Sequence, residues 1–348
     1  MIVINARFLT QTITGVQRFA LEICRHLPNV IADNDVVFVC PKGKKINYLE
    51  KNRKVIEIGS LSNNLWEQIE LPLFLKKKGN PLLINLVGIG PIAYKNKVLA
   101  LYDLAFYHHP EWFSFAFRKT YNFLVPISVS NAKHIITDSE YVKFDIHKTY
   151  GVDKNNIDVI YAAPSKKFKN LQLNREKIIL TVSSIDPRKN LTRIIKAFKG
   201  IESDFKLVIV GKSNNSFAKS NIEVESITSE IEFTGYLSDE ALVQLYNKAS
   251  IFIYGSLFEG FGIPPLEAQA CGCSCIVSNS TSLPEVYQNS VRYCDPLSID
   301  SIRNALDCLV KNQEERENLQ SLGFKNLKRF DWETSSKKLE LIIAKLST

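Results

Sequence analysis

The stretch that decides the fold runs from Ile251-Phe252-Ile253-Tyr254 through a short loop to Glu259-Gly260-Phe261-Gly262-Ile263-Pro264-Pro265-Leu266-Glu267. The first four residues form a short apolar run, which predicts a buried strand. The proline pair suits the first turn of a helix, which we expect to continue to Ala270. The stretch therefore predicts a strand, a loop and a helix, the repeating unit of an α/β fold.

Two carboxylates mark this unit, Glu259 at the strand end and Glu267 one turn into the helix. Ligands of open α/β sheets bind beyond the carboxyl ends of the strands. Gly260 and Gly262 let a ligand approach the backbone, and the N–H groups at a helix start attract anions. Acids beside an anion site favour hydroxyl groups as partners, so the pattern indicates a nucleotide-sugar site. An ordinary loop with two surface acids is the alternative.

Apolar runs alternate with helical patterns along the whole chain, and 348 residues exceed the usual size of one core. We expect two Rossmann-like, doubly wound parallel-sheet domains facing a central cleft, over residues 1–165 and 166–330. Residues 331–348 should form a helix that packs back on the first domain. The predicted strands are Ile2–Ala6, Val36–Val39, Val55–Ile58, Leu82–Asn85, Val98–Tyr102, His134–Asp138, Ile178–Ser183, Lys206–Val210, Ile231–Thr234, Ile251–Tyr254, Ser274–Ser278 and Val291–Tyr293. Residues 157–170 are predicted to form a further strand that leads into a linker between the two domains.

Composition favours a cytosolic protein. No run approaches the ~20 apolar residues of a membrane span, and the N-terminus is too short and uncharged for a signal peptide. The seven cysteines fit no zinc pattern and are expected to be buried thiols. Of the net charge of +8, +6 lies in residues 1–165, with clusters at residues 42–54 and 76–78. This bias suits an anionic partner, which could be nucleic acid, a phosphorylated substrate or an acidic membrane surface. An ordinary solvated surface is the alternative.

The second half opens with Asp186-Pro187-Arg188-Lys189-Asn190 after a predicted strand. We expect Asn190 to cap the following helix. Arg188 and Lys189 then stand near a helix N-terminus, where cations oppose the dipole. This unfavourable placement favours a phosphate-binding role for both, in the same cleft as Glu259.

Other motifs narrow the class of protein. The loop before Gly15 lacks the G-x-G-x-x-G pattern of dinucleotide-binding enzymes. No P-loop, Ser-His-Asp order or metal-ligand cluster stands out in the sequence. Asp103 ends a strand and should face the cleft, and the next loop contains His108 and His109, which we expect to be packed or solvated.

These residues resemble the retaining GT-B glycosyltransferases of family 4, over nearly the whole chain. The resemblance depends on the two-acid stretch, on residues 186–190, and on four further motifs: Gly15-Val16-Gln17-Arg18, Leu65-Trp66-Glu67-Gln68, Tyr102-Asp103-Leu104-Ala105 and Thr137-Asp138-Ser139-Glu140. The second of these is similar to a feature of bacterial mannosyl- and rhamnosyltransferases.

The resemblance implies that residues 1–165 form an acceptor-binding domain and residues 166–330 a nucleotide-sugar-binding domain. It also implies a role for each site residue. Glu259 would hold hydroxyls of the donor sugar and Glu267 the ribose of the nucleotide. Arg188 and Lys189 would bind the diphosphate, and Asp103 would complete the catalytic group. The remaining donor-binding residues would be Gly15, Ser184, Phe261, Gly262 and Ile263. No cofactor or metal is implied, because cations and amides neutralise the leaving group.

Three positions depart from the family pattern. Tyr102 replaces a common histidine near the transferred sugar, so Tyr102 is a candidate for donor specificity. Ser274 replaces a proline, which we interpret as a local backbone difference. Residues 85–90 replace a polar stretch on the acceptor side, which suggests a different acceptor.

The resemblance implies a peripheral enzyme of the inner membrane face that moves a hexose or deoxyhexose to a lipid-linked glycan, in O-antigen or capsule synthesis. GDP-mannose is the first donor candidate, before dTDP-rhamnose and UDP-hexoses. A GT-B sugar-nucleotide epimerase or phosphorylase is the rival enzyme. The rival outside enzymes is a basic nucleic-acid-binding module. It would interleave basic and aromatic residues, whereas the basic clusters here are flanked by aliphatic ones, so no nucleic-acid partner is expected.

Overall fold

The computed structural model describes residues 1–27, 36–43, 53–211 and 230–347, and the chain divides into two compact units. The N-terminal unit comprises Met1–Leu104, Lys119–Ala162 and Asp331–Thr348. The C-terminal unit comprises Ala105–Arg118 and Ala163–Phe330. The main boundary at Ala162 lies close to the expected division at residue 165, but the segment Ala105–Arg118 groups with the C-terminal unit.

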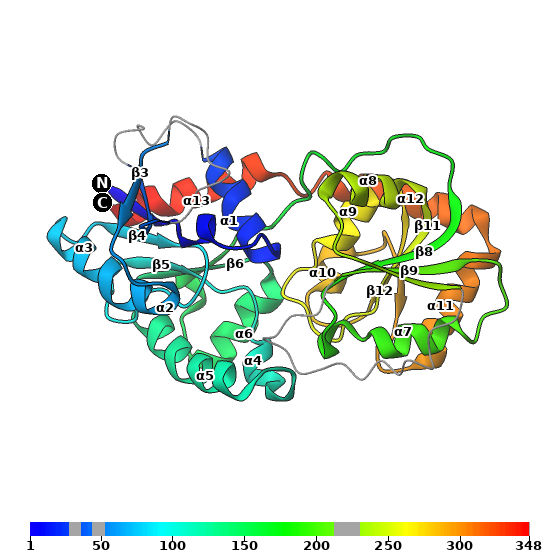
Figure 1. The fold of residues 1–348 in the computed structure, drawn as a ribbon, viewed down its shortest axis with the longest axis horizontal. Coiled ribbons are helices and arrows are strands. Elements are labelled where there is room, and N and C mark those ends of the chain that lie inside the picture. The colour runs from blue at the N-terminus through cyan, green and yellow to red at the C-terminus, as the bar shows by residue number, and fades with distance from the viewer. Residues whose placement is uncertain (28–35, 44–52, 212–229, 348) are drawn as a thin grey trace. The chain divides into compact units, whose positions relative to one another are not determined.

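A parallel sheet of seven strands forms the centre of the N-terminal unit, in the order β3-β2-β1-β4-β5-β6-β7 (Figure 1). Most of its strands are buried along their whole length, as expected for a parallel sheet covered by helices. The strands are β1 (Ile2–Asn5), β2 (Val36–Pro41), β3 (Val55–Ile58), β4 (Leu82–Asn85), β5 (Lys97–Ala100), β6 (His134–Thr137) and β7 (Ile157–Val159).

The last helix of the chain, α13 (Trp332–Ser347), belongs to the N-terminal unit and packs on α1 (Gly15–His26). The Ser336 hydroxyl donates to the carbonyl of Ile23 at 2.9 Å, and the rings of Trp332 and Phe19 meet edge to face at 5.6 Å. The other helices of this unit are α2 (Asn63–Leu65), α3 (Leu71–Lys77), α5 (Phe115–Ser130), which begins in the segment Ala105–Arg118, and α6 (Glu140–Tyr150). A π-helical turn, Trp66–Glu70, joins α2 to α3.

A six-stranded parallel sheet forms the centre of the C-terminal unit, in the order β10-β9-β8-β11-β12-β13 (Figure 1). Its strands are β8 (Glu176–Val182), β9 (Lys206–Val210), β10 (Ile231–Gly235), β11 (Ala249–Tyr254), β12 (Ser274–Ser278) and β13 (Arg292–Cys294). Its helices are α4 (Ala105–His108), α7 (Leu191–Phe198), α8 (Asp239–Lys248), α9 (Pro264–Ala270), α10 (Leu283–Tyr287), α11 (Ile299–Lys311) and α12 (Gln313–Leu327).

The main core of the C-terminal unit lies between this sheet and the helices α7 and α11. Its residues include Ile179 and Ile251 from the sheet and Ile194 and Leu306 from the two helices, all nearly inaccessible to solvent. The aliphatic side chains come from neighbouring strands and helices, so burial of apolar surface holds the layers together.

In each sheet, the side on which successive strands are added changes at one point. In the C-terminal sheet, β9 and β10 are added on one side of β8, and the next strand in sequence, β11, is added on the other side. Loops at such a switch point diverge and leave a crevice at the carboxyl edge of the sheet. The loops after β8 and β11 carry Lys189 and Glu259, which are therefore neighbours in space.

The structure confirms the predicted α/β fold class and every predicted strand to within a few residues. The sequence analysis predicts no helix over α4, α6 or α10, which are short or weakly patterned. No helix among the described residues is both long and apolar enough to cross a membrane.

Candidate active site of the C-terminal unit

A strand, a loop and a helix build the site, as the sequence predicts. The strand β11 ends at Tyr254, and the helix α9 begins at the first of its two prolines. Gly262 has a φ of +86°, and a Cβ atom there would lie 2.8 Å from Cδ2 of Leu283. Both observations require glycine, because an L side chain would be strained by the backbone and by its neighbour.

Three side chains meet at the end of β11. The Nζ atom of Lys189 lies 2.6 Å from Oε1 of Glu259 and 3.0 Å from the hydroxyl oxygen of Tyr254. The Tyr254 hydroxyl donates to the same carboxylate oxygen at 2.9 Å. All three residues are buried, so the ion pair is shielded from water and from salt.

The charges determine the protonation of this cluster. Burial alone would raise the pKa of Glu259, but the nearby cations Lys189 and Arg188 outweigh burial and lower the pKa below its usual value. Burial first, and the Glu259 charge second, raise the pKa of Tyr254 well above its usual range. The carboxylate therefore stays ionised and the phenol stays protonated near neutral pH, which makes Tyr254 a hydrogen-bond donor to Glu259.

The loop after β8 is held in place by its own polar groups. Asp186 accepts hydrogen bonds from the Ser184 hydroxyl at 2.5 Å and from the N–H of Arg188 at 3.1 Å. The Arg188 carbonyl accepts from the N–H of Leu257 at 2.8 Å, which joins this loop to the loop after β11. Ser184, expected to bind phosphate, thus has its hydroxyl proton engaged by Asp186.

The expectation that the Asn190 side chain caps α7 is wrong. Asn190 occupies the N-cap position in the left-handed conformation, with a φ of +60°, and makes no capping bond. Its amide instead donates to the carbonyls of Gly255, at 3.0 Å, and Pro296, at 2.7 Å. Asn190 therefore connects the loops that follow β8, β11 and β13.

Glu267 lies one turn into α9 and has a separate partner. The hydroxyl of Tyr246, on α8, donates to Oε2 of Glu267 at 3.3 Å. Burial first, and Glu267 second, raise the pKa of Tyr246 well above its usual range. The two acids of the motif thus lie in different surroundings: Glu259 pairs with Lys189, and Glu267 accepts a hydrogen bond from Tyr246.

The sequence analysis missed the two tyrosines that hold these acids. Tyr254 ends the strand β11, a position where polar side chains reach the edge of a parallel sheet, and this signal was available from the sequence. Tyr246 lies in a helix distant in sequence from Glu267, and no local pattern links the two.

Three expected site residues belong to the N-terminal unit. Gly15 begins α1 and has open space at the position of a Cβ atom. The Tyr102 hydroxyl donates to the carbonyl of Leu86 at 2.7 Å, and its ring meets Phe19 edge to face at 5.1 Å. Asp103 follows Tyr102 at the end of the β5 segment.

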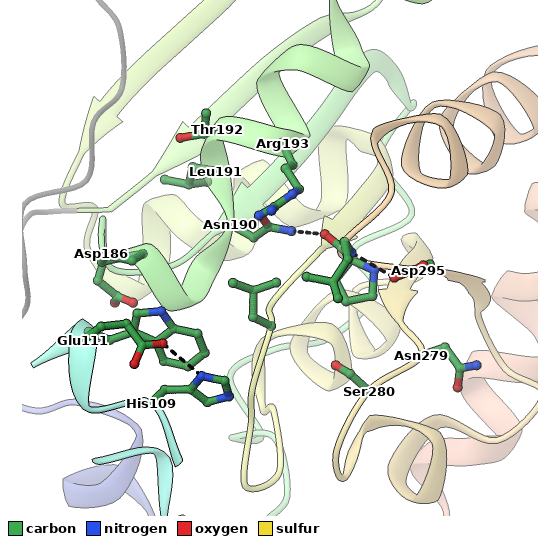
Figure 2. A pocket seen from close by; sticks show the side chains of 15 residues that line it. His109, Glu111, Asp186, Asn190, Leu191, Thr192, Arg193, Asn279, Ser280 and Asp295 are labelled. Atoms are coloured by element: carbon green, nitrogen blue, oxygen red, sulfur yellow. Dashed lines mark hydrogen bonds and ion pairs between the residues drawn. The ribbon is translucent and has the colours of Figure 1, made fainter. Parts of the chain in front are cut away.

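A cavity of about 810 Å³ lies beside the loops that carry Lys189 and Glu259, and all of its lining residues belong to the C-terminal unit. Figure 2 shows the side chains that line it. The segment Ala105–Arg118 forms one side, and the loops after β8, β11, β12 and β13 form the other. Asp186 and Asn190 line the cavity, whereas Lys189, Glu259 and Glu267 do not. The loop after β8 therefore contributes Asp186 and Asn190 to the cavity and Lys189 to the buried ion pair with Glu259.

The fold and the comparisons with known sequences define a glycosyltransferase. Residues 13–163 match the sequence profile of "Glycosyltransferase Family 4", and residues 163–325 match that of "Glycosyl transferases group 1". The two profiles together span most of the chain, which belongs to the family 4 glycosyltransferases of the GT-B fold and is an enzyme of the hexosyltransferase class.

Relatives with known names support this assignment. The O-antigen chain mannosyltransferase RfbU of Salmonella typhimurium is 28% identical over 347 residues, which cover 95% of this chain and 96% of that protein. The O-antigen chain mannosyltransferase B of Escherichia coli is 30% identical over 224 residues, or 59% of each chain.

Solved structures agree in fold. Sucrose-phosphate synthase from Thermosynechococcus elongatus has a TM-score of 0.78 at 16% identity, covering 99% of this chain and 98% of that one. WaaG, a glycosyltransferase involved in lipopolysaccharide biosynthesis, has a TM-score of 0.75 at 15% identity and covers 99% of each chain.

Proposed function

We propose that the protein is a retaining mannosyltransferase that uses GDP-mannose and extends a lipid-linked glycan of the O-antigen type. The observation that carries the proposal is the buried Lys189–Glu259 pair at the switch point of the C-terminal sheet, followed by Glu267 on α9. The similarity to RfbU over nearly the full length of both chains supports the choice of sugar and pathway.

The donor-binding residues divide according to charge. Glu259 accepts hydrogen bonds from hydroxyls of the sugar, and Glu267 from those of the ribose. Arg188 and Lys189 bind the diphosphate, together with the amides of Phe261, Gly262 and Ile263. The remaining contacts come from Gly15 and Ser184.

Lys189 donates to Glu259 at 2.6 Å, and in this proposal the same ammonium group also bonds the diphosphate. A Lys ammonium carries three protons and can bond several acceptors at once. Together with Arg188 it neutralises the negative charge that develops as the nucleotide leaves, without a metal. Among the described residues, no group of three or more His, Cys, Asp or Glu is arranged to hold a metal ion.

Retention follows from a front-face path. A double displacement requires a protein carboxylate as nucleophile behind the anomeric carbon. Glu259 is committed to the ion pair with Lys189 and serves as a hydroxyl acceptor, so we assign no nucleophile to this chain. An oxygen of the leaving diphosphate takes the proton of the acceptor hydroxyl as the bond from the sugar to the phosphate breaks and the new glycosidic bond forms. Asp103 completes the polar surroundings of the reacting groups.

A panel of nucleoside diphosphates and their sugars tests the donor. A ligand at 100 times its Kd stabilises a protein by about 2.7 kcal/mol, a shift of roughly 5–10 °C in Tm for a domain of this size. GDP and GDP-mannose should give the largest shifts. Larger shifts with UDP or dTDP compounds would overturn the choice of donor.

Product analysis tests the reaction. With GDP-mannose and a lipid-linked acceptor, the new glycosidic bond should have the α configuration of the donor. An epimerised nucleotide sugar formed without acceptor would identify an epimerase, and a requirement for inorganic phosphate would identify a phosphorylase.

We also propose that the enzyme binds the cytoplasmic membrane surface peripherally through the helix of residues 63–77. Leu65, Ile69 and Leu73 lie four residues apart on one face and are 60%, 47% and 54% exposed. Lys76 and Lys77 form its last turn, and Lys78 follows. Such a face combines apolar insertion with attraction to anionic lipids, at about 1 kcal/mol per cation.

Vesicle flotation tests the membrane proposal. Binding to acidic vesicles should fall steeply with salt and should be reduced in Ile69→Ser/Leu73→Ser. Leu341→Ser, which changes a leucine that is 70% exposed on α13, serves as the control. Equal binding of the two variants, or binding that salt leaves unchanged, would contradict this surface. Of the basic cluster at residues 42–54, Lys44, Lys45 and Lys51 lie outside the described residues.

A further inference from the structure

The cavity beside the Lys189–Glu259 pair has a chemistry of its own. His109 and Glu111 stand on one side, and Asn279 and Ser280 face them from the loop after β12 (Figure 2). Its volume of about 810 Å³ falls within the range of ~300–1,000 Å³ that is usual for small-molecule sites. Leu257 lines the cavity and stands two residues before Glu259 on the same loop, so a ligand here lies next to the candidate active site.

The charge of the lining disfavours phosphate. Three carboxylates line the cavity, those of Glu111, Asp186 and Asp295, against one guanidinium, that of Arg193. Arg193 already donates to Oδ1 of Asn190 at 2.9 Å. An anionic group would be repelled here, whereas the neighbouring Arg188 and Lys189 attract one. The nucleotide and its phosphates therefore do not belong in this cavity.

Several lining groups are available to a neutral polar ligand. Within the described part of the chain, neither the side-chain amide of Asn279 nor the hydroxyl of Thr192 has a recorded hydrogen bond, and both line the cavity. The Ser280 hydroxyl donates to the carbonyl of Ser256 at 3.3 Å, which leaves its oxygen able to accept. A lining that offers both donors and acceptors matches a ligand rich in hydroxyl groups.

Flat and apolar surfaces complete the lining. The imidazole of His109 stacks on the indole of Trp112, with ring centroids 3.9 Å apart and planes 12° apart. Glu111 holds Nδ1 of His109 at 3.1 Å, which fixes the ring. Pro187, Pro296 and Leu297 add apolar contact area. Sugar rings have apolar C–H faces and polar edges, so they suit a cavity with both kinds of surface.

We propose that this cavity binds neutral sugar units of the acceptor glycan. The inference rests on the proposed transferase function, since a growing glycan is the hydroxyl-rich neutral substrate of that reaction. The loop after β8 would then contact both substrates, with Lys189 on the donor side and Asp186 on the glycan side.

A direct binding experiment tests the cavity. Saturation-transfer NMR would measure the full-length protein with a panel of disaccharides of mannose, galactose, rhamnose and N-acetylglucosamine. Asn279→Trp fills the cavity with an indole, and we expect it to raise the Kd of the disaccharide that binds by roughly tenfold or more. Asn318→Trp makes the same change at an exposed residue of α12 that does not line the cavity, and it should bind as the wild type does.

Two results would overturn the assignment. One is that no disaccharide gives a signal with the wild type at millimolar concentrations. The other is that Asn279→Trp binds the disaccharide as tightly as Asn318→Trp does. Thr192→Val, which removes only a hydroxyl, is the second variant if Asn279→Trp does not fold, and it should raise the Kd by about two- to tenfold.

Donor hydrolysis separates this proposal from the proposed function. In wild type supplied with GDP-mannose and acceptor, both transfer to the glycan and hydrolysis by water would be measured. Asn279→Trp should lower the ratio of transfer to hydrolysis by roughly tenfold, while Asn318→Trp leaves it unchanged. If the wild type uses no nucleotide sugar, the proposed function fails. If Asn279→Trp loses hydrolysis and transfer in equal proportion, the cavity serves the donor and the glycan assignment is wrong.

Discussion

Replacing Lys189 by methionine removes one partner of the buried ion pair while keeping most of the side-chain volume. In the structure, Nζ of Lys189 lies 2.6 Å from Oε1 of Glu259, and the two side chains are only 9% and 8% exposed. The variant therefore leaves the Glu259 carboxylate buried without its nearest cation.

The expected loss of stability is large for a single substitution. Removing one partner of a buried pair costs about 3–5 kcal/mol, because the other charge remains in a poorly solvated place. Tyr254 still donates to Glu259 at 2.9 Å, so we expect the lower end, about 3 kcal/mol. For a domain of this size that corresponds to a fall in Tm of roughly 6–12 °C.

The loss should depend on pH with a definite sign. In the wild type, burial raises the pKa of Glu259, but Lys189 and Arg188 lower it by more than burial raises it. The native pKa therefore lies below its usual value. A depressed native pKa gives stability that is present above the unfolded-state value of about 4.3 and is lost as pH falls through the native one.

The variant should show the opposite dependence. Without Lys189, burial is opposed mainly by Arg188, and we expect the native pKa of Glu259 to rise above that of the unfolded chain. Stability then declines as pH increases through the raised pKa. The difference in the free energy of unfolding between wild type and variant should therefore be largest near pH ~7 and shrink toward pH ~4.

Chemical denaturation at several pH values would measure this gap. Lys248→Met is the matched control, because Lys248 and Glu176 form a pair at 3.1 Å in the same unit whose side chains are 47% and 50% exposed. An exposed pair contributes less than about 1 kcal/mol. Equal losses in the two variants, or a gap that does not shrink in acid, would refute the stabilising ion pair.

Three further predictions concern catalysis. Replacing both Arg188 and Lys189 by alanine should lower the turnover rate by about 10²–10⁴-fold, because charge-assisted contacts to phosphate strengthen as the leaving group departs; a folded double variant with near-normal turnover would reject the diphosphate role. Glu259→Gln should reduce turnover more than affinity for GDP, whereas Glu267→Ala should reduce the affinity itself, and calorimetry showing equal losses would contradict this division. Tyr102→His should change the ratio of kcat/KM between donors by altering volume and hydrogen bonding near the sugar. An unchanged ratio would leave Tyr102 the role visible in the structure, a hydroxyl held by Leu86 and a ring against Phe19.

The sequence alone predicts the elements of the fold well, because local patterns determine them. Val55–Ile58, Leu82–Asn85 and Lys206–Val210 are strands with the bounds that their apolar runs indicate. Continuous apolar runs predict strands of a buried parallel sheet, and the proline pair predicts the start of α9. The helix α10 was missed because five residues are too few to show a period.

The positions of Glu259, Glu267 and Lys189 at the ends of elements also follow from the sequence, since each stands just after a strand or just inside a helix. Their partners do not. Lys189 and Glu259 are 70 residues apart, and Tyr246 is 21 residues from Glu267. Which loops become neighbours depends on the order of strands in the sheet, and no local pattern encodes that order.

Tertiary structure also decides which hydrogen-bond partners a side chain has. Local rules predict Asn190 as a helix cap, but the carbonyls of Gly255 and Pro296 lie within its reach and take its amide. The cavity between the segment Ala105–Arg118 and the loops of the second sheet arises in the same way, from segments far apart in the chain. Sequence determines the elements and their apolar faces through short-range sterics and burial, whereas the pairing of polar groups depends on distances that exist only after the sheet has formed.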